Sequence, residues 1–273
     1  MGILNVTPDS FADGGLHLDP DRAVDAALRM VEDGADIIDV GGESTRPGAE
    51  PLPQAEELRR VIPVIERLAG RVTVPLSIDT YKAAVAREAV AAGASIVNDV
   101  SGLQYEPELG GVVAETGAAV VLMHTRGRSS GMYELARYRD PAAEVASELR
   151  DAIARAAAAG IPREAIVIDP GFGFAKRAEH SAALLAQLHT LHALERPILS
   201  GPSRKSFLKA ALGERPAADR EWGTAAAVTA SILLGAHIVR VHGVKAMVDV
   251  ARVADLIRAA AQSIPNLQFP IPK

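Results

Sequence analysis

The 273-residue chain contains no cysteine. It therefore has no disulfide, no thiolate metal ligand and no cysteine nucleophile, and the absence leaves its redox compartment undecided. An excess of positive charge is also lacking, because 34 acidic residues outnumber 29 lysines and arginines and give a net charge of −5. This balance argues against a nucleic-acid partner, although positive charge gathered at one place can still bind an anion.

Long hydrophobic runs are missing as well. The longest apolar segment, residues 225–239, is interrupted by Thr229, Ser231 and His237. It falls short of the ~18 residues that a membrane span needs. The start of the chain, residues 1–6, has no basic leader, so we expect no signal peptide. These features predict a cytoplasmic protein with no membrane partner.

What the chain does contain is a recurring pattern of glycine, usually alanine, an apolar run and a polar residue. Glycine after a helix followed directly by a buried strand is typical of the αβ half of a βαβ unit. Further apolar runs without the glycine bring the number of predicted strands to eight. The pattern occurs at residues 34–40, 93–99, 117–124 and 235–242, and the further runs are residues 3–6, 74–78, 166–168 and 197–199.

Helical periodicity fills the gaps between these strands. Asp19-Pro20 and Asp140-Pro141 each place a capping residue before a proline at the first helical position, and apolar residues at helical spacing over 247–261 predict a closing helix. The sequence therefore predicts an α/β protein, a single (β/α)8 TIM barrel that spans 1–273 as one domain. A doubly wound open sheet is the alternative, and polar strand ends all along the chain weaken it.

Polar residues follow every predicted strand. In a barrel the carboxyl ends of the strands form one face, where the loops build the site. Any one such residue is more often a cap or a turn former, but a set from eight strands predicts a functional face. The set comprises Asn5, Asp39, Asp79, Asn98 with Asp99, His124, Asp169, Ser200, and Arg240 with His242.

Residues 166–176 are the most informative of these stretches. Asp169 follows three branched apolar residues, and a carboxylate at the end of a buried strand is costly unless something pairs with it. The loop behind it carries glycines, two aromatic residues and a lysine, which suits a flat ring with an acidic recognition point. The simpler interpretation, that Asp169 only orders its own turn or caps the next helix, is equally well supported by this stretch alone.

Positive charge gathers in the last two loops of the predicted barrel. Residues 201–206 combine glycine and serine with Arg204 and Lys205, which indicates either an anion site or an ordinary solvated turn. Arg240 and His242 alternate along the eighth strand, so their side chains should point to the same side. The same two loops hold phosphate in many barrels. No Ser–His–Asp set and no zinc-ligand spacing accompany them.

Taken together, the motifs resemble those of the dihydropteroate synthase family, in the family's order and over the whole chain. The resemblance implies a barrel enzyme of folate biosynthesis, a transferase that joins 6-hydroxymethyl-7,8-dihydropterin pyrophosphate to p-aminobenzoate and releases pyrophosphate. The matching stretches are residues 1–11, 41–48, 77–80, 98–100, 169–176, 203–206 and 240–242.

The resemblance also implies roles for individual residues. The pterin ring would be held by Asp79, Asn98, Met123, Asp169, Phe174 and Lys205, of which Asp79, Asp169 and Lys205 would be catalytic. The pyrophosphate would be bound by Asn5, Thr45, Arg240 and His242, with Asn5 as the ligand of a Mg²⁺ cofactor. The p-aminobenzoate would be bound by Phe11, Arg46, Pro47 and Ser206. A homodimer is expected as well.

Several features depart from the family's pattern. Ala175 stands where glycine is common, Gly243 stands where aspartate commonly follows the histidine, and residues 124–133 have an unusual form. The first strand begins at once, whereas family members usually carry an earlier segment, so we expect a trimmed start with an exposed apolar underside. A corrinoid-type pterin methyltransferase and a non-catalytic pterin-binding paralogue are the alternatives. Lys205, Ser206 and the first two loops would have no explanation in the methyltransferase.

Overall fold

A computed structural model of the chain describes residues 1–7, 19–44 and 48–262. In this part, short strands alternate with helices. The strands are β1 (Gly2–Asn5), β2 (Ile38–Gly41), β3 (Leu76–Asp79), β4 (Ile96–Asp99), β5 (Ala119–Met123), β6 (Ile166–Asp169), β7 (Leu199–Ser200) and β8 (Ile238–Val239). The α-helices are α2 (Pro20–Glu32), α3 (Gln54–Ala69), α4 (Ala83–Ala91), α5 (Glu108–Thr116), α6 (Pro141–Ala158), α7 (Ala178–Ala186), α8 (Lys209–Leu212), α9 (Glu221–Leu233) and α10 (Val244–Gln262). Four 3₁₀ segments, η1 (Arg163–Ala165), η2 (Leu188–Leu194), η3 (Ser206–Leu208) and η4 (Ala217–Arg220), complete the connections.

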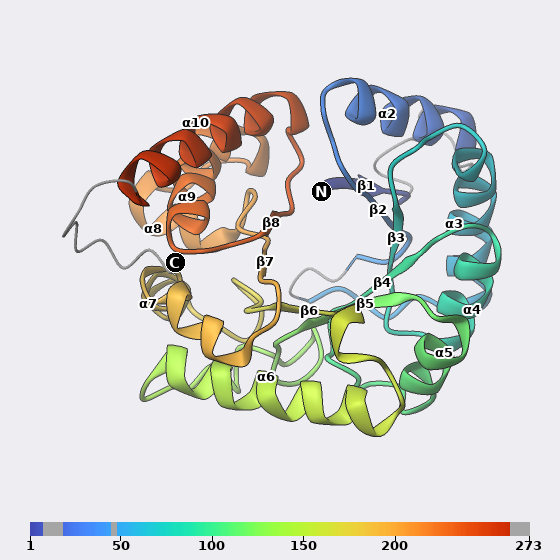
Figure 1. Cartoon of the computed structure of the whole chain (residues 1–273), viewed down its shortest axis with the longest axis horizontal. Coiled ribbons are helices and arrows are strands. Elements are labelled where there is room, and N and C mark those ends of the chain that lie inside the picture. Colours follow the sequence, from blue (N-terminus) through green and yellow to red (C-terminus); the bar gives the residue numbers. More distant parts are fainter. Residues whose placement is uncertain (8–18, 45–47, 263–273) are drawn as a thin grey trace.

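The strands form a parallel ring. β1 to β6 pair in sequence order, and β7 pairs with β8. Isolated parallel bridges join the two sheets, one between Ile168 and Ile198 and the other between Gly2 and Val241. Figure 1 shows the helices outside the strands. The predicted (β/α)8 barrel and its eight strands are therefore confirmed, and the doubly wound alternative is wrong.

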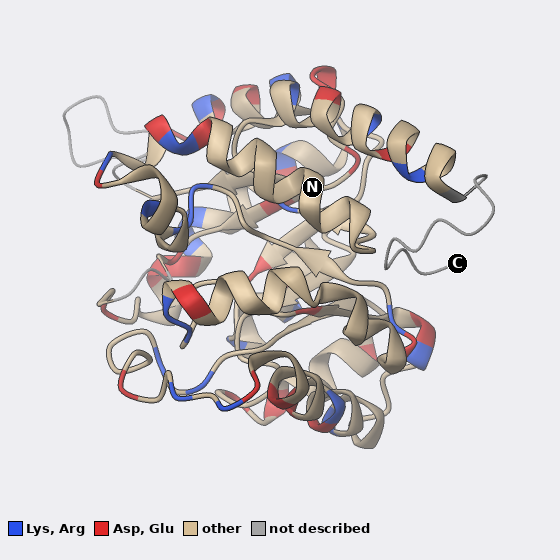
Figure 2. Cartoon of the chain, turned by 90° about the vertical axis from the view of Figure 1, so that its left-hand side faces the viewer, with Lys and Arg blue, Asp and Glu red and all other residues tan. Residues whose placement is uncertain are grey.

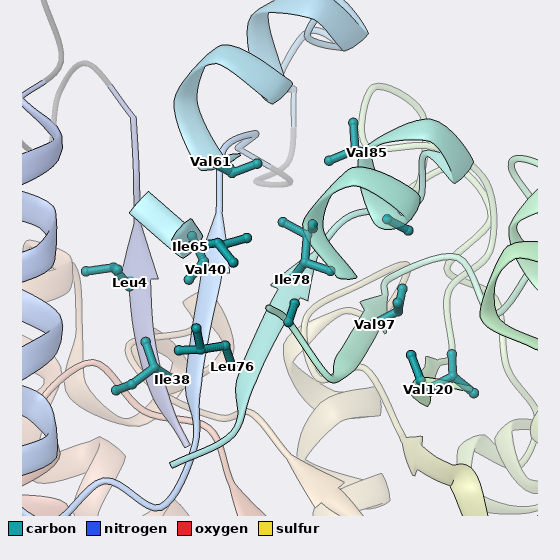
Figure 3. Close-up of a cluster of buried hydrophobic side chains, with 14 of the residues drawn as sticks. Leu4, Ile38, Val40, Val61, Ile65, Leu76, Ile78, Val85, Val97 and Val120 are labelled. Atoms are coloured by element: carbon teal, nitrogen blue, oxygen red, sulfur yellow. The ribbon is translucent and has the colours of Figure 1, made fainter. Parts of the chain in front are cut away.

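The outward faces of the strands pack against the helices. Because side chains alternate between the two faces of a strand, every second residue meets the helix layer. Each of these side chains is buried, so the β1–β5 side of the ring and helices α3 and α4 share one continuous apolar core (Figure 3). Its members include Leu4, Ile38, Val40, Leu76, Ile78, Val97 and Val120 from the strands and Val61, Ile65 and Val85 from the helices.

The inward faces change character along the barrel. A small apolar cluster fills the interior near the amino ends of the strands. In four of these strands, the residue two positions further along also faces inward and reaches the carboxyl-end face of the barrel. Three of these four side chains are polar. The cluster contains Met1, Ile96, Val121, Val167, Leu199 and Ile238, and the positions two residues on are Asn98, Met123, Asp169 and Arg240.

The capped helix starts that the sequence predicts are confirmed. Asp140 precedes α6, and its Oδ1 accepts hydrogen bonds from the backbone N–H groups of Ala142 and Ala143, both at 3.1 Å. Asp19 accepts in the same way from Asp21 N at 2.9 Å before α2. Each carboxylate thus satisfies backbone donors that the helix leaves unpaired.

Replacing Asp140 with alanine should lower the free energy of unfolding by about 1 kcal/mol, because two N–H groups at the start of α6 lose their acceptor. Urea unfolding followed by circular dichroism measures the change. Asp151→Ala, at an exposed position within the same helix, is the control and should stay within about 0.5 kcal/mol of the parent protein. Equal effects of the two substitutions would show that the cap contributes nothing.

The charged residues are spread over the helices. In Figure 2 the positions of acidic and basic residues are interspersed along the ribbon, and neither sign is confined to one part of the view. Among the helices of the described residues, none combines the length and the apolar character that crossing a membrane requires.

Candidate active site

A cavity opens at the carboxyl ends of the strands. All six residues to which the family resemblance assigns the pterin ring line this central cavity, and Arg240 lines it with them. The six come from β3 to β6 and from the loops after β6 and β7, so widely separated segments meet here. They are Asp79, Asn98, Met123, Asp169, Phe174 and Lys205. A larger, more open hollow on the surface, lined in part by Arg137, Arg139 and Arg177, contains none of the strand-end residues.

An ion-pair network lies at one side of the central cavity. Arg240 donates from Nε to Asp39 Oδ2 at 2.6 Å and from Nη2 to Asp79 Oδ2 at 2.7 Å. Asp39 Oδ2 also accepts from Asn98 Nδ2 at 3.0 Å. One guanidinium therefore neutralises two carboxylates from neighbouring strands, and Asp39 orients two of the residues that line the cavity.

The environment shifts the pKa values of the acids. Burial raises the pKa of Asp79 to about 7, although Arg240 opposes the shift. Burial likewise raises the pKa of Asp169, opposed by the hydrogen bond from Gly171 and by the charge of Lys205. Burial disfavours the charge of Arg240, but Asp39 and Asp79 outweigh it and raise the pKa of the guanidinium. Such shifts are common where charged groups serve a ligand rather than the fold.

Asp169 both orders its own turn and faces the cavity. Its Oδ1 accepts a hydrogen bond from the backbone N–H of Gly171 at 2.7 Å. The turn requires glycine, because φ of Gly171 is +67° and a methyl group there would lie 2.1 Å from the carbonyl oxygen of His124. Asp169 therefore orders its own turn and also presents an acidic group to the cavity, so the two interpretations of the 166–176 stretch do not exclude each other.

The loop after β6 forms a wall of the cavity. The ammonium of Lys205 lies 3.9 Å from the centre of the Phe174 ring. Ala175, where the family resemblance gives a common glycine, has φ of +49° and is fully buried. The left-handed backbone explains why glycine is favoured at this position, and the alanine adopts the conformation nonetheless.

A second cluster lies where the last two loops meet. His242 Nδ1 is 2.9 Å from Ser203 Oγ, and Arg204 Nε donates to Glu221 Oε2 at 2.9 Å. A methyl group at Gly243 would lie 2.1 Å from Glu221 Oε1. The carboxylate of Glu221 therefore fills the space into which a side chain at 243 would project.

Some strand-end residues do not reach the cavity. Asp99 accepts hydrogen bonds from the backbone N–H groups of Ser101 and Leu103, so it orders a turn. Ser200 Oγ bonds Ser231 Oγ of α9 at 2.8 Å, on the outer side of the barrel. The expectation that all eight strand ends converge is wrong for these two, because consecutive residues of a strand face opposite sides.

Two other expected positions also differ. His124 and Lys176 contact each other beneath the loop after β6, and neither lines the central cavity. The 166–176 stretch suggested that its lysine helps to receive the ring. Lys176 is not part of the cavity surface, so this suggestion is wrong. Ser206 is exposed at the start of η3, outside the cavity lining and next to Lys205 in the chain. Phe11, Thr45, Arg46 and Pro47 lie outside the described residues.

A metal ion would find few protein ligands at this face. No group of three or more acidic or histidine side chains that could hold an ion exists in residues 1–7, 19–44 and 48–262. Asn5 ends β1 and offers one amide oxygen, on a strand that pairs with β2. Mg²⁺ is often held in this way, by one or two protein oxygens with substrate phosphates and water supplying the rest. The donor set fits Mg²⁺ in that mode.

Three contributors could not be identified from the sequence alone. Asp39 was predicted to lie at a strand end without a further role, and no role was predicted for Ser203 or for the chain of contacts around Lys176. Alternation along β2 was the available signal for Asp39, because the apolar residues on either side of it face the helices. The other contacts join loops far apart in the sequence and carry no local signal.

Comparison with known proteins agrees with this geometry. Residues 1–242 match the family described as "Pterin binding enzyme". Dihydropteroate synthase of Synechocystis sp. is 47% identical over 257 residues, which are 94% of this chain and 89% of the relative. The structure of Xanthomonas albilineans dihydropteroate synthase with 4-aminobenzoic acid has a TM-score of 0.89 and 46% identity, over 97% of this chain and 93% of that one.

A second structure of the Xanthomonas albilineans enzyme, in complex with 7,8-dihydropteroate, has a TM-score of 0.85 and 43% identity over 97% of this chain and 94% of that one. Sequence and fold therefore agree over nearly the whole length on both sides. The chain belongs to the family of pterin-binding enzymes and, within it, to the dihydropteroate synthases.

Proposed function

We propose that the chain is a transferase that condenses 6-hydroxymethyl-7,8-dihydropterin pyrophosphate with p-aminobenzoate to form 7,8-dihydropteroate and pyrophosphate. The observation that carries the proposal is the central cavity, in which six residues of five different chain segments surround one space. The 7,8-dihydropteroate and 4-aminobenzoic acid bound by the Xanthomonas albilineans relative support the same substrate pair.

Asp169 is the proposed anchor for the pterin ring. A pterin presents a guanidine-like edge of N–H donors, which one carboxylate can accept with two hydrogen bonds. Asp79 is less suited as the main acceptor, because its Oδ2 already accepts from Arg240. Asp79 and Asn98 would instead bind a second edge of the ring, with Met123 and Phe174 packing near its faces. Lys205 would contact the ring beside Phe174.

Arg240, His242 and Thr45 are the proposed partners of the pyrophosphate. Cleavage of the C–O bond leaves negative charge on the departing group, which cations and hydrogen-bond donors stabilise. The contact of Nδ1 with Ser203 orients the His242 ring, and Nε2 is the atom that would donate to a phosphate oxygen. Asn5 would hold Mg²⁺, which when bound would neutralise part of the charge of the pyrophosphate.

The reaction follows a dissociative, SN1-like path in this proposal. The electron pair of the C–O bond leaves with the pyrophosphate, the delocalised pterin methylene is left electron-poor, and the amine nitrogen then forms the C–N bond and loses a proton. An arylamine is neutral at pH 7 and already nucleophilic, so the site needs no strong base. Positional isotope scrambling in the pyrophosphate is expected; its absence, with a steep dependence on amine nucleophilicity, would exclude this path.

The p-aminobenzoate would bind beside Lys205. Phe11, Arg46, Pro47 and Ser206 are the proposed contacts, with the Ser206 hydroxyl donating a hydrogen bond to the carboxylate. We also propose a homodimer in the cytoplasm, with the whole chain as a single domain. Sedimentation at several protein concentrations tests the dimer.

Release of pyrophosphate tests the activity itself. With both substrates and Mg²⁺, a coupled assay should detect pyrophosphate in proportion to 7,8-dihydropteroate formed. A non-catalytic pterin-binding protein would bind the pterin and release none. A pterin methyltransferase would have no pyrophosphate to release, and the match to dihydropteroate synthases over 94% of the chain argues against it.

A further inference from the structure

Behind the central cavity lies a connected set of five side chains that the proposed reaction does not use. The Nζ of Lys176, which is 1% exposed, lies 2.7 Å from Nδ1 of His124. The other ring nitrogen of His124, Nε2, lies 2.9 Å from Glu148 Oε2 on α6. Arg126 donates from Nε to Glu148 Oε1 at 3.0 Å and from Nη2 to Glu144 at 2.8 Å. This set, called the Lys176 chain below, runs from a buried ammonium to the surface.

Lys176 holds the backbone of two loops. Besides His124 Nδ1, its ammonium is within hydrogen-bond distance of three carbonyl oxygens: that of Phe174 at 3.0 Å, that of Gly171 at 3.1 Å and that of His124 at 3.3 Å. Four acceptors thus surround the three protons of the ammonium. Gly171 and Phe174 line the central cavity, and His124 directly follows Met123, which also lines it. The buried ammonium therefore holds the backbone of the cavity wall through hydrogen bonds.

The protonation of His124 fits this arrangement. Burial and the charge of Lys176 lower the pKa of His124 to about 4, so the ring is neutral at pH 7. Its Nε2–H then donates to Glu148, and Nδ1 accepts from Lys176. Although burial opposes ionisation, the hydrogen bonds from His124 and Arg126 hold the pKa of Glu148 at about 2. The carboxylate therefore selects the tautomer that Lys176 needs.

Among the residues that the structure describes, no carboxylate is in direct contact with the Lys176 ammonium. Burial lowers its pKa to about 7, while the charges of Asp169 and Glu148 favour the ammonium and those of Arg126 and Lys205 disfavour it. A buried amine without a contacting acid is costly to the fold, and a site that binds a ligand is where such a cost is expected.

We infer that Lys176 is a positioning residue for the pterin ring: it fixes the carbonyl groups that set the place of Phe174 and Gly171, and Arg126 and Glu148 keep His124 oriented toward it. The inference rests on the proposed function, because it assumes that the ring binds in the central cavity. Phe174 also lies under the Lys205 ammonium, so a shift of this wall would move two of the proposed ring contacts together.

Lys176→Met tests the inference, since methionine fills a similar volume and donates no hydrogen bond. Calorimetry with 6-hydroxymethyl-7,8-dihydropterin pyrophosphate, without p-aminobenzoate, should show a Kd about 30-fold above that of the parent protein, because a small displacement of a binding wall is costly. The KM for p-aminobenzoate should stay within about twofold. Lys245→Met, at an exposed position of α10, is the matched control and should change neither value.

A second pair of variants keeps the test decisive if Lys176→Met does not fold. Glu148→Ala removes the acceptor of His124 and should raise the pterin Kd about fivefold, whereas Glu148→Gln keeps an acceptor oxygen and should stay within about twofold. Hydrogen exchange at the amides of 171–176 should speed up in Glu148→Ala only. A purely structural role would lower stability and leave pterin affinity unchanged.

The outcomes separate the inference from the function it rests on. If the parent protein binds no pterin pyrophosphate, the proposed function is wrong. If the parent binds it and folded Lys176→Met, or Glu148→Ala in its place, binds within about twofold of the parent, the positioning role is wrong.

Discussion

Asp169→Asn is expected to abolish the activity without lowering the stability of the protein. Asparagine keeps an oxygen for the N–H of Gly171, so the turn survives. Its amide NH2, however, replaces the second acceptor and would face the N–H donors of the pterin. Losing a charge-assisted pair and leaving buried donors unmatched should reduce kcat/KM for the pterin by about 10³ or more.

The thermal stability of the same variant should stay equal or rise, whereas its activity falls. Burial raises the pKa of Asp169 in the folded protein, so the folded state binds more protons than the unfolded state between the two pKa values. The ionised carboxylate therefore costs stability that increases as the pH rises, and the neutral amide removes this cost. At pH 7 the Tm of Asp169→Asn should equal or exceed that of the parent.

Asp99→Asn supplies the matched control. Asp99 is also buried at the end of a strand, but both its oxygens accept from backbone N–H groups of the following turn. The amide can replace only one acceptor, so the Tm should fall with a loss of about 1–3 kcal/mol. The kcat/KM of the folded variant should stay within about threefold. If Asp169→Asn kept its kcat/KM within about tenfold, the assignment of Asp169 as the anchor would fail.

Arg240→Met should cause the largest loss of stability. It leaves Asp39 and Asp79 buried without the guanidinium that both carboxylates contact. Removing one partner of a buried ion pair typically costs about 3–5 kcal/mol. Chemical denaturation at pH 8 should show a loss of this size, and pterin turnover should fall with it. Arg163→Met breaks an exposed ion pair with Glu195 and should cost less than about 1 kcal/mol.

The pH dependence identifies the cause of that loss. Burial raises the pKa of Asp79 to about 7 even beside Arg240, and without Arg240 the pKa should rise further. A carboxyl whose folded pKa lies above its unfolded pKa binds a proton on folding, so stability falls as the pH rises from about 4 toward the folded pKa. Arg240→Met should thus be more stable at pH 5 than at pH 8, and adding Asp79→Asn should remove much of the difference. A loss independent of pH would contradict this account.

The sequence predicted the barrel because its signals are local. Glycine followed by an apolar run marks the start of a strand, and Asp140-Pro141 marks the start of a helix, so each element needs only its own neighbours. The residues of the central cavity could be named for a similar reason. In a parallel barrel the carboxyl ends of all strands share one face, so Asp79 and Asp169 had to lie on the same side of the molecule.

What the sequence could not supply was the direction of individual side chains and their distant partners. Asn98 and Asp99 are adjacent, and alternation sends one into the cavity and the other to a turn. Ser200 ends a strand of two residues, too short for a pattern to show which way it points. The pairing of Arg240 with Asp39 spans 201 residues, and that of Lys176 with His124 spans 52. Such contacts depend on packing that only the folded chain contains.

Glu221 and Gly243 show how a departure from a family pattern can depend on a residue elsewhere in the chain. A side chain at 243 and the ion pair of Glu221 with Arg204 compete for the same space. Introducing the family's aspartate at 243 alone would push Glu221 aside and release Arg204, whereas removing Glu221 alone would empty the space and leave Arg204 without its partner. The two positions are thus epistatic: an exchange of Gly243 for aspartate requires a change at 221 as well, and substitutions at either position alone would underestimate what the pair tolerates.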